Sequence, residues 1–175
     1  GADHISLTIK ACGDFTSTIN RIKPGDLAAV HGPFGRFSCD LHDDDCELVF
    51  VAGGVGITPL MSMLRAMRDR RQPRRVTLIY ANRDPDDILF RPELAEMETG
   101  QWPALQVIYV LSQPPTGWSG QTGRVDAKRL EEWCHGFDDK AFYLCCPARM
   151  IKELVRGLGR KGVSPRHIHC DYFSL

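Results

Sequence analysis

Three glycines in four residues, Gly53, Gly54 and Gly56, follow an apolar run, and Thr58 and Pro59 come directly after them. Glycines at the end of a strand let the backbone approach a ligand closely and adopt positive φ. A helix that opens on Thr and Pro presents free N–H groups and a partial positive charge, which suit a phosphate. The loop alone fits two interpretations equally: a phosphate site, or a tight strand-to-helix turn without a ligand.

The spacing of this loop narrows the kind of phosphate site. It differs from G-x-G-x-x-G, and no Lys-Ser or Lys-Thr pair follows it. Both departures disfavour a P-loop for ATP or GTP.

Cysteine usage limits the other kinds of site. The chain has seven cysteines, an odd count without a repeating spacing, and it contains no C-x-x-C. These features argue against a disulfide framework, a zinc site and a plant-type iron–sulfur cluster, so we expect no metal site. They indicate a reducing compartment and hence a cytoplasmic location. No apolar run approaches the roughly 20 residues of a membrane helix, although the chain fits the cytoplasmic domain of a membrane protein as well.

The charge balance excludes one further class of partner. Lys and Arg together number 22, as do Asp and Glu, so the formal net charge is zero. A dedicated nucleic-acid binder needs a net basic face, so we expect no nucleic-acid partner. The basic run from Arg68 to Arg75 is interpreted as a solvated helix end and loop.

The hydrophobic pattern of the elements that must position the glycine loop changes near residue 45. Before it, Ile5 to Lys10 alternates apolar and polar residues, which is typical of a half-buried antiparallel strand, and LAAVHG and GRFSCDL indicate two more strands. After it, five apolar stretches recur at intervals of roughly thirty residues, the length of βαβ units. They are CELVFVA, RVTLIYA, LQVIYVL, AFYLCC and HIHCDYF.

Helical patterns lie between the later stretches. Ile57, Leu60, Met61, Leu64 and Met67 fall on one helical face, and residues 150–158 repeat the pattern. The layout predicts an α/β fold with a five-stranded parallel sheet and helices on both faces. The first 45 residues are too few to bury a sizeable core by themselves.

Eight motifs in order give the chain a family resemblance. They are GDFTSTI, KPGD, HGPFGRF, GGVGITP, LIYANRDPDDILFRPEL, YVLSQPPTGWSGQTGRV, YLCCPARM and DYFSL. The series resembles the ferredoxin–NADP reductase superfamily over nearly its full length, and most closely the predicted ferric reductases and related flavin-dependent NAD(P)H oxidoreductases. The resemblance implies two parts. Residues 1–45 match the second half of an antiparallel FAD-binding β-barrel, and residues 46–175 match the NAD(P)-binding domain.

The resemblance also implies an activity. In this family hydride passes from nicotinamide C4 to flavin N5, and single electrons then leave to a haem domain, ferric iron or a ferredoxin-like protein. The chain lacks the family's Arg-x-Tyr/Phe-Ser/Thr flavin signature. We therefore expect it to be the C-terminal part of a longer flavoprotein, inactive and poor at binding FAD alone, with exposed strand edges that allow an edge-paired dimer. The alternative is a non-catalytic nucleotide-binding or regulatory module.

Several site residues follow from the resemblance. Gly53, Gly54, Val55 and Gly56 would wrap the pyrophosphate of NADH or NADPH. Thr58 would lie beside the nicotinamide, where its hydroxyl serves as ligand contact and helix cap, or as a cap only.

Cys145 matches the cysteine of the family's C-G-P motif near the hydride-transfer position. A neutral thiol there would shape the nicotinamide pocket; the alternative is a small buried strand residue. Cys146 replaces the family glycine and precedes Pro147. If this position needs positive φ or a close ligand approach, the side chain of Cys146 would weaken nicotinamide binding.

Asp171 and Phe173 match the acidic-x-aromatic ending of the family. The aromatic ring there covers the flavin isoalloxazine, and the alternative for Phe173 is core packing in a terminal strand. Thr16 matches a residue that contacts the FAD pyrophosphate, and a simple N-cap is an equal alternative.

The coenzyme depends on what meets the adenosine 2′ position. Family NADPH users often have Ser-Arg after the third strand, whereas this chain has Ser112 and Gln113, which slightly favours NADH. Arg83 and Arg124 are nearby candidates for a 2′-phosphate contact, or surface residues.

Overall fold

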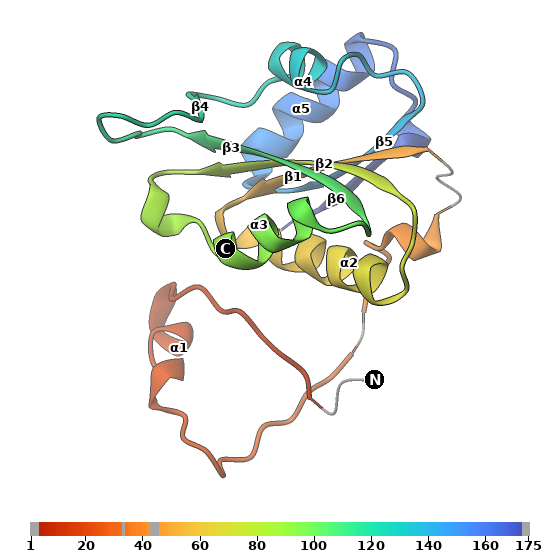
Figure 1. The fold of residues 1–175 in the computed structure, drawn as a ribbon. Coiled ribbons are helices and arrows are strands. Elements are labelled where there is room, and N and C mark those ends of the chain that lie inside the picture. The colour runs from red at the N-terminus through yellow and green to blue at the C-terminus, as the bar shows by residue number, and fades with distance from the viewer. Residues whose placement is uncertain (1–3, 33, 43–45, 173–175) are drawn as a thin grey trace. The chain divides into compact units, whose positions relative to one another are not determined.

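The computed structural model describes residues 4–32, 34–42 and 46–172 (Figure 1). The chain divides into two compact units, one before Phe37 and one from Phe37 onward, and each is described by itself. Phe173 lies outside the described residues.

The second unit is built on one sheet of six parallel strands in the order β4-β3-β2-β1-β5-β6. The predicted α/β fold with a parallel sheet is confirmed, and each of the five predicted stretches forms a strand. The short β4 adds a sixth, which is too brief to leave an apolar pattern. The strands are β1 Glu47–Gly53, β2 Arg75–Asn82, β3 Ala104–Leu111, β4 Gln121–Thr122, β5 Lys140–Cys145 and β6 Ile168–Asp171.

Helices cover both faces of this sheet, as predicted. Helices α2 and α3 lie on one face of the sheet, and α4 and α5 lie on the other (Figure 1). Their buried side chains contribute to two separate hydrophobic clusters. The layering explains the nearly continuous apolar runs of the central strands, since residues pointing either way are buried. The helices are α2 Ile57–Asp69, α3 Arg91–Thr99, α4 Ala127–Trp133 and α5 Ala148–Arg160.

The strand order reverses at β1, which pairs with β2 on one side and β5 on the other. In an open parallel sheet, the crevice outside the carboxyl ends at such a switch point is where ligands bind. Gly53 ends β1 and Cys145 ends β5, with Ala52 directly opposite Cys145. The fold therefore brings the glycine loop and the Cys145 segment together at the carboxyl ends of the strands, which we call the glycine-loop edge of the sheet.

The basic run from Arg68 to Arg75 spans the end of α2, the following loop and the start of β2. Several of its arginines bind other parts of the second unit. Arg70 forms an ion pair with Asp40 at 2.5 Å, and Arg74 donates to the carbonyl of Cys46 at 3.2 Å.

An ion pair joins the two helices on one face of the sheet. Arg65 of α2 donates to both carboxylate oxygens of Glu93 in α3, at 2.9 and 2.7 Å, and Arg68 lies 3.3 Å from the same carboxylate. The Arg65 guanidinium also lies 5.1 Å from the centre of the Phe90 ring. Hydrogen bonding from Arg65 holds the pKa of the Glu93 carboxyl below its ordinary value.

We expect Glu93→Gln to lower the free energy of unfolding by about 1 kcal/mol at pH 7. A carboxyl whose pKa is depressed by folding stabilises the folded state above its unfolded pKa of about 4.3, and this contribution is lost as the pH falls through the folded pKa. Urea unfolding of the wild type and the variant should therefore differ at pH 7, and the difference should shrink in acid as the pH falls through the folded pKa of Glu93. Glu96→Gln, at an exposed position of the same helix, is the control and should change little at pH 7 or in acid. An equal difference for Glu93→Gln at pH 7 and in acid would contradict the argument.

The first unit differs from the predicted half-barrel. No strand occurs among residues 4–32 and 34–42, so the expectation of strands at Ile5 to Lys10, LAAVHG and GRFSCDL is wrong for this structure. The described helical elements of the first unit are α1 Gly13–Thr16 and a short 3-10 turn at Ile19–Arg21. A further 3-10 turn at Cys39–Leu41 belongs to the second unit. A strand needs a neighbouring strand for its main-chain hydrogen bonds, and alternation in the sequence reports only which side chains would share a face.

The alternating apolar side chains of the first unit remain exposed. Ile5 and Leu7 are 74% and 69% exposed, and Leu27 and Phe34 are also open to solvent. These side chains thus form no core, as expected for a segment too short to build one.

None of the helices in residues 4–32, 34–42 and 46–172 combines the length and the apolarity that crossing a bilayer requires.

Candidate functional site

The glycine loop turns directly from β1 into α2. Gly54–Gly56 form one 3-10 turn after Gly53, and α2 begins at Ile57. Gly54 has φ +53° and open space where a side chain would start, so its left-handed backbone favours glycine. Backbone N–H groups at the junction with α2 donate to the carbonyls of Gly54 and Val55. The N–H groups at the start of the turn and the helix dipole therefore favour an anion.

Two other glycines are needed for packing against the Cys145 segment. A Cβ on Gly56 would lie 1.9 Å from the carbonyl oxygen of Cys145. A Cβ on Gly53 would lie 2.7 Å from both the Cys146 Cβ and the Pro147 Cδ. The loop and the Cys145–Pro147 segment are therefore in direct contact, which the spacing in the sequence does not reveal.

Thr58 is not the cap of α2. The N-cap is Gly56, no side chain caps the helix, and Thr58 is its second residue. Pro59 is in the first turn, as expected, where its missing N–H costs nothing. Among the described residues the Thr58 hydroxyl has no hydrogen-bond partner, and the side chain is half-buried, which leaves the hydroxyl for another contact.

Cys145 carries a neutral thiol. It is fully buried at the end of β5, and burial raises its pKa to about 12, with a further increase from the nearby Asp171 carboxylate. Such a thiol is a poor nucleophile at neutral pH. Cys145 can therefore shape a pocket but does not supply a reactive thiolate.

Cys146 points to the other face of the sheet. It belongs to the core beneath α4 and α5, whereas Cys145 belongs to the core beneath α2 and α3. Cys146 is not among the described residues with positive φ, so the side chain at the family's glycine position causes no backbone strain. Both thiols are free.

Asp171, the last residue of β6, pairs in register with Cys145 on β5. Its carboxylate is therefore at the same edge of the sheet, one strand beyond the Cys145 thiol. Phe173, predicted two residues later, lies outside the described residues.

Ser112 and Gln113 follow the carboxyl end of β3 and are exposed. Their N–H groups donate to the carbonyls of Asn82 and Arg83 at 3.1 and 2.8 Å, which joins the ends of β2 and β3. The Arg83 Nε also donates to the Gln113 side chain at 2.8 Å. The Arg83 guanidinium therefore lies beside the uncharged Ser112 and Gln113, where the adenosine is predicted to bind.

Thr16 belongs to the first unit. It ends α1 instead of opening a helix, so the N-cap alternative is wrong. Its hydroxyl donates to the Cys12 carbonyl at 2.5 Å and accepts from the Cys12 N–H at 2.7 Å.

Sequence reasoning missed one polar residue of this edge, Asn82. It ends β2, one residue beyond the Ala81 that pairs with Gly53, and is only 8% exposed. The available signal is a polar residue that closes the apolar run of β2, which by itself indicates no more than the end of a strand.

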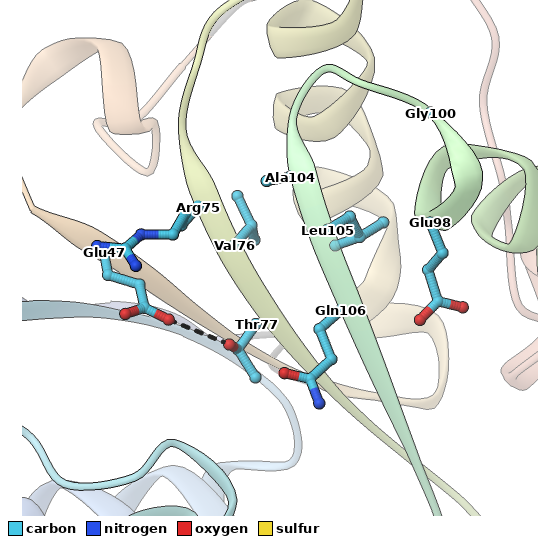
Figure 2. A pocket seen from close by; sticks show the side chains of 9 residues that line it. All are labelled: Glu47, Arg75, Val76, Thr77, Glu98, Gly100, Ala104, Leu105 and Gln106. Atoms are coloured by element: carbon cyan, nitrogen blue, oxygen red, sulfur yellow. Dashed lines mark hydrogen bonds between the residues drawn. The ribbon is translucent and has the colours of Figure 1, made fainter.

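A cavity of about 320 Å³ lies at the opposite end of the strands, near their amino ends (Figure 2). Its lining includes Glu47, Thr77 and Gln106 near the amino ends of β1, β2 and β3. The Thr77 hydroxyl donates to Glu47 at 3.4 Å, and Lys140 forms an ion pair with the same carboxylate at 2.8 Å. This cavity is separate from the glycine-loop edge.

The chain is similar to proteins that are named as NADH-cytochrome b5 reductases. The sequence profile of the oxidoreductase NAD-binding domain matches residues 50–156. The chain is 33% identical to NADH-cytochrome b5 reductase 1 of Aspergillus fumigatus, over 94% of this chain and 56% of that protein. It is 34% identical to NADH-cytochrome b5 reductase 1 of Arabidopsis thaliana, over 87% of this chain and 55% of that protein.

Solved structures agree with these relatives. The CS-b5R domains of human Ncb5or in the NAD⁺ form match with a TM-score of 0.79 and 29% identity, over 94% of this chain and 47% of that one. The chain thus spans little more than half the length of the relatives named here.

Proposed function

The chain belongs to the oxidoreductase NAD-binding domain family, within the ferredoxin–NADP reductase superfamily, and from this premise we propose that it is the NAD(P)H-binding, C-terminal part of an FAD-dependent oxidoreductase. One observation carries the proposal. The glycine loop is packed against Cys145 at the switch point of a parallel sheet, with a glycine where a side chain could not fit.

In this proposal Gly53, Gly54, Val55 and Gly56 hold the pyrophosphate of the dinucleotide. The open, left-handed Gly54 lets the backbone approach the ligand, and the start of the glycine turn and the dipole of α2 favour its charge. Contacts through the backbone and a helix dipole suit the phosphate of any nucleotide. Specificity for one coenzyme therefore has to come from the nicotinamide end and the adenosine end of the site.

At the nicotinamide end we place Thr58, Cys145, Cys146, Pro147 and Asp171. The free Thr58 hydroxyl is available to the carboxamide, and the neutral Cys145 thiol borders the ring without attacking it. A bound reduced nicotinamide supplies the hydride, and FAD in the intact protein accepts it. We further propose that Phe173 covers the flavin ring.

The domain division remains part of the proposal: residues 1–45 as the second half of an FAD-binding barrel, and residues 46–175 as the NAD(P) domain. The described residues of the first part form no strand, and the Thr16 hydroxyl is engaged with Cys12. They do not build a flavin site by themselves, so FAD binding, including a Thr16 contact, is proposed for the whole protein. We also propose the edge-paired dimer of the isolated chain. Exposed apolar side chains such as Ile5 and Leu7 support association, whereas residues 4–32 and 34–42 contain no strand whose edge could pair.

The electron acceptor is proposed from the relatives. Their names specify cytochrome b5 as the partner, which supports a haem protein, with ferric iron or a ferredoxin-like protein as further candidates. The seven free cysteines support a reducing, cytoplasmic location.

Titration of the chain with NADH and NADPH, followed by the fluorescence of the reduced nicotinamide, tests the proposal. Saturable binding is expected without added flavin. Absence of binding by a folded chain would overturn the proposal of an independent nucleotide site. Binding without flavin reduction in the full-length protein would instead support a non-catalytic module.

The coenzyme preference gives a second test. Ser112 and Gln113 carry no charge, which favours NADH, and Arg83 is the cation beside them. We expect Arg83→Ala to weaken NADPH binding about tenfold through loss of a charge-assisted contact, and to leave NADH binding within about twofold. The measurement is the same titration with both coenzymes, with Arg156→Ala on the exposed side of α5 as the control. Equal losses for both coenzymes would contradict a 2′-phosphate contact.

A further inference from the structure

Asn82 is a buried amide whose polar atoms are unused. The residue is 8% exposed, and neither its Nδ2 nor its Oδ1 has a hydrogen-bond partner within the described residues. A buried amide without partners lowers stability, so native proteins nearly always satisfy such groups. An amide kept at this position calls for a partner in another state of the protein.

The position of Asn82 points to the glycine loop. Gly53 of β1 pairs with Ala81 of β2, so the next residue along β2 lies beside the Gly54–Gly56 turn. β2 is in contact with this turn. Asn82 also accepts the Ser112 N–H through its own carbonyl, which fixes its backbone at the end of the strand.

Tyr80 is the nearest alternative partner. Its hydroxyl accepts the Leu89 N–H at 3.2 Å. Burial raises the pKa of Tyr80 to about 12, and the Leu89 N–H and the Asn82 amide oppose this rise. The Asn82 amide therefore approaches the hydroxyl, but the two side chains do not reach hydrogen-bonding geometry.

We propose that Asn82 is a positioning residue of the nucleotide site, whose amide pairs with peptide groups of the Gly53–Gly56 loop when the loop closes around the pyrophosphate. This inference rests on the proposed function. The free chain keeps the amide unpaired, and the bound chain regains the hydrogen bonds. Part of the affinity for the dinucleotide therefore comes from a group that the ligand does not touch.

The proposal predicts opposite effects on stability and on binding. We expect Asn82→Ala to leave the urea midpoint of the nucleotide-free chain unchanged or higher, because an unsatisfied amide is removed. The same variant should bind NADH and NADPH about tenfold more weakly. A residue that only supports the fold would instead lower the midpoint and leave the affinity unchanged.

Tyr109→Phe is the matched control. The Tyr109 hydroxyl is also buried without a hydrogen bond, but it is on β3, which β2 separates from the glycine-loop strand. Its removal should leave the midpoint unchanged or higher and leave both affinities within about twofold of the wild type. A parallel loss of affinity in Tyr109→Phe would contradict a role specific to Asn82.

The remaining outcomes also decide the question. Wild-type affinity in Asn82→Ala would overturn the inference, and so would failure of both Asn82→Ala and Asn82→Ser to fold, since the amide would then be needed in the free chain. If Tyr80→Phe weakens binding as much as Asn82→Ala, the partner is the tyrosine hydroxyl and the loop contact is wrong. Absence of binding by the wild type itself would overturn the proposed function, and this inference with it.

Discussion

A Gly56→Ala variant is expected to lose nucleotide binding and to unfold much more readily than the wild type. The added Cβ would lie 1.9 Å from the carbonyl oxygen of Cys145 and 2.7 Å from its carbonyl carbon. Both are main-chain atoms of β5, which is paired on either side with β1 and β6 and has little freedom to move. We expect a loss of about 3 kcal/mol in the free energy of unfolding, the upper end of the usual cost of overpacking.

Urea unfolding and coenzyme titration of the same preparation would measure both effects. Gly159→Ala is the control, because its Cβ would meet nothing within 4 Å and the residue lies inside α5. Alanine favours a helix over glycine by about 0.5–1 kcal/mol, so this control should be more stable than the wild type and bind equally well. A stable Gly56→Ala protein that binds coenzyme would show that the loop does not pack on Cys145 as described.

Gly54→Glu is expected to abolish binding while leaving most of the stability intact. The added side chain has open space, so no packing is lost, and the positive φ costs roughly 1 kcal/mol. The carboxylate would lie in the region that we assign to the pyrophosphate. Like charges about 4 Å apart repel by roughly 4 kcal/mol at the effective dielectric of a protein surface, which predicts a loss of more than about 100-fold in affinity.

Gly54→Ala separates the charge from the backbone effect. It carries the same φ penalty without a carboxylate, so its unfolding midpoint should match that of Gly54→Glu while it retains measurable affinity. Raised salt should partly restore binding to the Glu variant through screening, and it should not improve the Ala variant. Equal affinity of the Glu variant and the wild type would remove the pyrophosphate from this loop.

The two glycines therefore have different roles in the structure. Gly56 is required by the contact between the loop and β5, and its replacement acts on the fold first. Gly54 has an open, left-handed backbone in the region that we propose for the pyrophosphate, so its replacement should act on binding first. A site assembled from two segments more than eighty residues apart needs both.

The sequence by itself determined the sheet of this protein. The central strands β1, β2 and β5 are buried on both faces, so each leaves an apolar run that is visible without any structure. The partly buried β3 and β6 were visible from shorter apolar stretches at the same spacing. The helical stripe from Ile57 to Met67 gave α2 in the same way. The glycine loop was visible because conformational freedom and close approach restrict the residue type to glycine.

Only the tertiary structure decided the conformation of the first residues, the start of α2 and the contacts within the candidate site. Alternation at Ile5, Leu7 and Ile9 records a side-chain period, but a strand also needs a partner, and none is described there. Threonine is a residue type that often caps helices. Because the turn at Gly54–Gly56 lets α2 begin at Ile57, Thr58 lies inside the helix and does not cap it. The packing of Gly56 on Cys145 and the unpaired amide of Asn82 depend on which strands become neighbours. Local sequence does not encode that adjacency, because it is set by the packing of the whole sheet.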